Sequence, residues 1–67
     1  MNRFRVYCGP TLVGPLAERL TPHTGTVTEG TEHVYCTCNY TVYELLTLLN
    51  TVMSGYTLRD VQYLGTV

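Results

Sequence analysis

Two of the three cysteines and one of the two histidines fall within residues 33–40, which read HVYCTCNY. Thiolate and imidazole groups are common ligands of zinc in proteins, and thiolates also carry out redox chemistry. Cys8 is the remaining cysteine. These residue types would support a tetrahedral metal site or a thiol switch only if the fold brought them together.

Alternation along this stretch separates the thiols from the histidine. Successive side chains of a strand point to opposite faces, so Cys36 and Cys38 share the apolar face while His33 lies on the other. Cys8 falls on the apolar face of the first predicted strand, residues 3–8. We therefore expect three buried, reduced thiols that act as small apolar residues, and we predict no bound metal and no cofactor. The second hypothesis is a thiol- or metal-dependent regulator that uses the three cysteines.

No catalytic constellation is recognisable elsewhere. His23 lies in the loop-like stretch TPHTG, and the sequence places no nucleophile or carboxylate beside it. The five acidic residues form no recognisable pair for acid–base catalysis, and GPTLVGP lacks the lysine of a phosphate-binding loop. We predict that the protein is not an enzyme and has no catalytic residues.

The elements that must position these residues follow from hydrophobic periodicity. Residues 3–8 and 33–40 each alternate apolar and polar side chains, which predicts two half-buried strands. Thr41 and Glu44 have the spacing of a capping box, so a helix is expected to start there. Gly55 is suited to cap the C-terminus of that helix.

The last part of the chain, residues 56–67, is rich in tyrosine, leucine, valine and threonine and predicts a closing strand. Leu58 and Val61 are three residues apart, which is out of phase for a strand. We therefore expect a bulge or a late start near Arg59 and Asp60.

Residues 10–32 carry turn signals, including all three prolines. Within them PLAERL, residues 15–20, predicts a single helical turn with proline at its first position. Residues 26–28 predict either one arm of a hairpin or a loop.

Together these elements predict one α+β domain over residues 1–67, in the order strand, loop, strand, helix, strand. We expect a small three- or four-stranded, mainly antiparallel sheet that is covered on one face by a single helix. The strand–helix–strand step of residues 33–67 is compatible with a right-handed crossover, which would make its two strands parallel.

Charge is sparse, with four arginines, no lysine, five acidic residues and a net charge of −1. Nucleic acids and anionic membranes are bound largely through basic residues, so we expect neither as a partner. No run of about eighteen apolar residues and no leader-like start is visible, and we expect a cytoplasmic protein.

The polar faces of the two alternating strands offer the best candidate binding surface. If the strands are neighbours, one face carries residue types that are common at protein interfaces, namely Arg3, Arg5, Tyr7, His33 and Tyr35. Leu48 lies beside the apolar stripe of the helix and marks a second surface, on which a homodimer could form. We predict a small protein-interaction module that binds a protein partner or self-associates. A third hypothesis is an oligomer that binds a small molecule or nucleotide between its subunits.

The use of arginine in place of lysine is typical of a high-GC genome. The layout of a short sheet with GYTLRDV after a helix loosely resembles small bacteriophage proteins that bind and inhibit host enzymes such as RNA polymerase. This resemblance implies a phage or mobile-element accessory protein, and it assigns a role to no individual residue.

Overall fold

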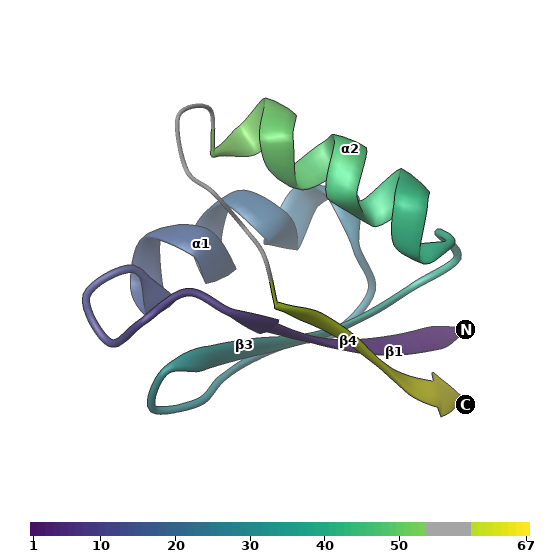
Figure 1. Ribbon diagram of the computed structural model, residues 1–67, viewed down its shortest axis with the longest axis horizontal. Helices are drawn as coiled ribbons and strands as arrows, with labels where there is room; N and C mark the ends of the chain where they lie inside the picture. The colour runs from purple at the N-terminus through teal and green to yellow at the C-terminus, as the bar shows by residue number, and fades with distance from the viewer. Residues whose placement is uncertain (54–59) are drawn as a thin grey trace.

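The computed structural model describes residues 1–53 and 60–67, and Figure 1 shows how its elements are arranged. In chain order these elements are β1 (Asn2–Tyr7), α1 (Val13–Leu20), a 3-10 turn (Thr21–His23), β2 (Val27–Glu29), β3 (His33–Cys38), α2 (Val42–Val52) and β4 (Val61–Thr66). The strands form one sheet in the order β2-β3-β1-β4.

Neighbouring strands of this sheet are antiparallel, and α1 and α2 lie on the same side of it (Figure 1). The predicted α+β class is therefore confirmed. β3 and β4 both run antiparallel to β1, so they are parallel to each other, but β1 lies between them. The strand–helix–strand step from β3 through α2 thus passes over β1 rather than joining two hydrogen-bonded neighbours.

The main difference from the sequence prediction is a second helix. We expected one helix and a single turn at residues 15–20, whereas α1 is eight residues long and begins at Val13. Pro15 is tolerated because it lies in the first turn, where backbone N–H groups have no partner within the helix. The apolar residues of α1 recur at helical spacing and are all buried: Val13, Leu16, Ala17 and Leu20.

Residues 26–28 belong to a hairpin, which was one of the two interpretations open to them. β2 pairs with β3 so that Glu29 faces Val34. The N–H of Gly30 donates to the carbonyl of His33 at 2.8 Å and closes the turn.

The start of α2 is fixed by the predicted capping box. The N–H of Thr41 donates to Oε1 of Glu44 at 2.9 Å, and the N–H of Glu44 donates to Oγ1 of Thr41 at 3.2 Å. These two bonds satisfy backbone donors that a helix start leaves without partners. Leu45 and Leu49 then point into the core and are fully buried.

β4 starts late, at Val61, as its phase predicted. Its register against β1 shifts by one residue between Tyr63 and Gly65, so Leu64 forms a bulge. Gly65 has a φ of +112°, a conformation that side chains disfavour and glycine adopts easily. Three residues named in the sequence predictions lie outside the described part of the chain: Gly55, Leu58 and Arg59.

The core fills the space between the helices and the sheet. β1 and β3 contribute their alternating apolar residues, and the helices contribute their inward stripes. The buried residues are Phe4, Val6, Cys8, Val13, Leu16, Ala17, Leu20, Val34, Cys36, Cys38, Leu45, Leu49 and Met53. Because β1 and β3 direct their apolar side chains to this side, their polar side chains are left on the opposite face of the sheet.

Candidate binding face on the open side of the sheet

The side of the sheet that points away from both helices gathers the polar residues of β1 and β3. Residues that face each other in an antiparallel pair have their side chains on the same side. The register forms three such pairs: Arg3 with Thr37, Arg5 with Tyr35, and Tyr7 with His33. The predicted grouping of the β1 and β3 candidates on one face is confirmed, and we call these six residues the open face.

Two residues of the outer strands extend the middle pair of the open face. Thr28 of β2 faces Tyr35, and Gln62 of β4 faces Arg5. Nη2 of Arg5 donates a hydrogen bond to Oε1 of Gln62. Neither outer residue could be assigned from the sequence, because periodicity along one strand does not reveal which strand lies beside it.

Three aromatic side chains form a continuous group on the open face. The rings of Tyr7 and His33 meet edge to face with their centroids 5.2 Å apart, and the ring of Tyr35 lies 6.3 Å from that of His33. Tyr7 is 40% exposed and Tyr35 is 37% exposed, whereas His33 between them is half-buried. Such rings combine a large apolar contact area with a polar tip, which is the property shared by many interface hot spots.

Two depressions mark the same surface. The larger has a volume of about 410 Å³ and is lined by Arg5, Tyr7, His33, Asp60, Val61 and Gln62. The smaller has a volume of about 180 Å³, and its walls include Arg3, Thr28, Tyr35 and Leu64. Both depressions are open to solvent. Small-molecule sites in proteins, by contrast, are usually concave enough to bury most of their ligand.

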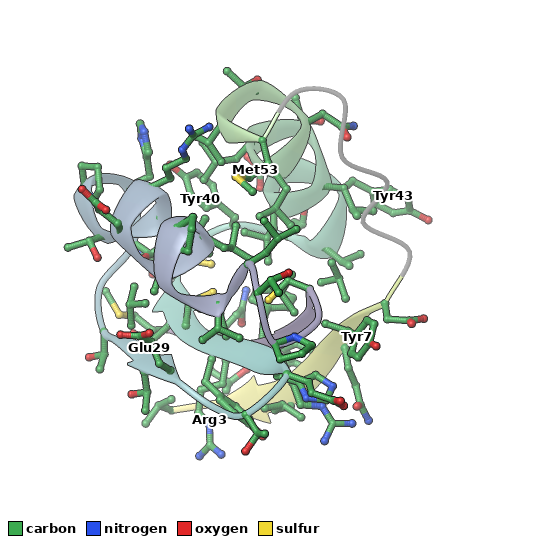
Figure 2. The ribbon with its side chains drawn as sticks, turned by 90° about the vertical axis from the view of Figure 1, so that its left-hand side faces the viewer. Arg3, Tyr7, Glu29, Tyr40, Tyr43 and Met53 are labelled. Carbon is green, nitrogen blue, oxygen red and sulfur yellow. The ribbon has the colours of Figure 1, made fainter. Side chains whose placement is uncertain are left out.

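The open face carries positive charge. Arg3 is exposed and points away from the helices (Figure 2), and Arg5 is hydrogen-bonded to the neutral amide of Gln62. Glu29 lies on the helix side of the sheet, since it faces the buried Val34. Within the described ranges no ion pair joins an arginine to an acidic residue.

The three thiols lie in the core, as predicted. Burial raises the pKa of Cys36 to about 12, and the neighbouring Cys38 adds to this effect. Burial also raises the pKa of Cys8, whose Sγ donates to the carbonyls of Gly9 and Glu32. Because the thiolate is the reactive and metal-binding form, this environment does not favour a thiol-dependent regulator. Among residues 1–53 and 60–67, no three His, Cys, Asp or Glu side chains are grouped to hold a metal ion.

The structure does not bring Leu48 together with the open face. Leu48 lies on α2, across the sheet, where it is half-buried and packs against the core. Tyr43 of the same helix is instead 79% exposed. His23 is exposed in the 3-10 turn and also lies apart from the open face.

No helix in the described part of the chain has the length and apolar character needed to cross a membrane. No protein family model, curated protein or solved structure matches this chain.

Proposed function

We propose that this chain is a non-enzymatic protein-interaction module that binds its partner through the open face. The observation that carries the proposal is the pairing of Arg5 with Tyr35 and of Tyr7 with His33 on the side of the sheet opposite both helices. Arginine and tyrosine are enriched at binding hot spots because each combines contact area with directional hydrogen bonding. A shallow surface of this kind suits a protein partner better than a small substrate, which binds in a more enclosed cleft.

The proposed setting is the cytoplasm, and the proposed origin is a phage or mobile element. The arginine-only basic composition, which is typical of a high-GC genome, supports the proposed origin. In the alternative form of the proposal, the binding partner is a second copy of the chain. Glu44 is the one charged residue of α2, and Tyr43 is exposed on it, so a second copy could pack on this helix. A domain of this size would gain stability from the surface buried in a dimer.

The double substitution Arg5→Ala with Tyr35→Ala is expected to abolish capture of the partner without unfolding the domain. It removes the central pair of the open face and takes no side chain from the core. Tyr43→Ala is the matched control, because it removes a more exposed tyrosine from α2 on the other side of the sheet. The measurement is quantitative capture from a lysate of the source cells by each immobilised variant, after circular dichroism has established that the variants fold.

Unchanged capture by the double variant would contradict the use of this face. If Tyr43→Ala loses capture while the double variant still captures the partner, the partner binds through α2 and not through the open face.

A further inference from the structure

We infer that the partner presents an extended acidic segment to the open face, with two carboxylates two residues apart that pair with Arg3 and Arg5. This partner chemistry deepens the proposed function, on which it rests. The charge, spacing and aromatic surroundings of the two arginines each point to such a segment.

The domain supplies no acidic partner for either arginine within its described residues. Glu18 lies on α1 and Glu44 in the first turn of α2, so both belong to the helical layer. Asp60 lines the larger depression near Arg5, at the end of the face next to β4. The strand that carries the arginines therefore presents positive charge to solvent, which complements an anionic partner.

The spacing of Arg3 and Arg5 selects the conformation of the partner. Alternate residues of a strand share a face and are about 6.8 Å apart along it. An extended peptide that lies along β1 has the same repeat, so its carboxylates at positions i and i+2 meet both guanidinium groups. Guanidinium and carboxylate groups match each other in bidentate geometry, which makes arginine well suited to this contact.

The aromatic group of the open face offers a contact for one more residue of the partner segment, beyond its two carboxylates. Tyr7 follows Arg3 and Arg5 at the same two-residue step on β1, and the rings of His33 and Tyr35 lie next to it. An apolar or aromatic residue at position i+4 of the partner would contact this group. A third carboxylate there would be opposed by the nearby Asp60, since like charges repel.

A peptide fits these charges better than a nucleic acid does. Single strands are bound through grooves that neutralise several successive phosphates, and the chain has a net charge of −1. Two arginines are enough for a segment with two carboxylates. The open face is thus matched in number of charges to a short acidic segment of a protein.

The test uses a fluorescein-labelled peptide that contains Glu-Ser-Glu-Ser-Phe between Gly-Ser flanks, titrated with the full chain and followed by fluorescence anisotropy. Arg3→Gln and Arg5→Gln are each expected to weaken binding about fivefold, the effect of losing one exposed ion pair. Arg19→Gln, which removes an exposed arginine from α1 on the helix side of the sheet, should bind like the wild type. Replacing both peptide glutamates by glutamine, or placing them side by side, should also weaken binding, because adjacent side chains of an extended chain point to opposite sides.

A charge exchange separates recognition from loss of folding. Arg3→Glu with Arg5→Glu should bind a Lys-Ser-Lys-Ser-Phe peptide and lose the acidic one. Equal binding of the glutamate and glutamine peptides, or tighter binding of a single-stranded oligouridylate than of the acidic peptide, would overturn the inference. If either peptide result is obtained while Arg5→Ala with Tyr35→Ala still loses partner capture, the open face binds the partner but the partner segment is not acidic. If capture is unchanged as well, the proposed function is wrong.

Discussion

Cys36 lies opposite Phe4 near the middle of the sheet, with its side chain in the core. A buried thiolate would lack the solvation that stabilises its charge, so the thiol holds its proton and its pKa is raised to about 12. His33 is three residues away in the chain but lies on the solvent side, where it contacts two tyrosines. Strand alternation thus places neighbouring residues of reactive type on opposite sides of the sheet, Cys36 in the core and His33 on the solvent side.

The raised pKa of Cys36 predicts a loss of stability at high pH. The unfolded chain loses this proton near pH 8.5, whereas the folded chain keeps it up to a pH of about 12. The contribution is therefore fully present below about pH 8.5 and declines as the pH rises towards the folded-state pKa. The free energy of unfolding, measured by guanidinium chloride titration between about pH 7 and about pH 10.5, should fall more steeply for the wild type than for Cys36→Ala. Parallel pH dependences of the two proteins would contradict this assignment.

The elements differ in how far local sequence specifies them. Residues 3–8 and 33–40 could be assigned because alternation also fixes which side chains are buried, and α2 because the Thr41 capping box marks its start. For α1 the sequence predicts only a single turn that starts at Pro15, whereas the buried stripe from Val13 to Leu20 stabilises a longer helix that begins two residues earlier. Tertiary packing decides such cases, since the intrinsic preferences of short segments are weak.

The capping box of α2 predicts a measurable cost for its removal. Thr41→Ala deletes the acceptor of the Glu44 N–H and should lower the free energy of unfolding by about 1 kcal/mol. Thr47→Ala is the matched control, because Thr47 lies exposed within the same helix and is not a cap. Chemical denaturation monitored by circular dichroism measures both. A cost for Thr47→Ala equal to that for Thr41→Ala would show that the cap is not the source of the effect.

At the scale of the molecule, the open face depends on a property that no single strand contains. Alternation indicates that Arg5 and Tyr35 are polar-side residues of their strands, but only the order β2-β3-β1-β4 makes them direct neighbours. The same order brings Gln62 to Arg5 from the far end of the chain. Periodicity along one strand shows which side chains share a face, but it does not reveal which strand lies beside it.

The role of α1 in that packing can be tested with one core truncation. Leu16 is fully buried, so Leu16→Ala should cost about 2–5 kcal/mol. A domain of this length has only a few kcal/mol of net stability, and the variant should be largely unfolded at room temperature. Leu48→Ala removes the same atoms from a half-buried position on α2 and should cost clearly less. The stabilities of the two variants are compared by guanidinium chloride denaturation followed by circular dichroism. A Leu16→Ala variant as stable as the wild type would mean that residues 13–20 do not contribute to the core, and that one helix alone covers the sheet.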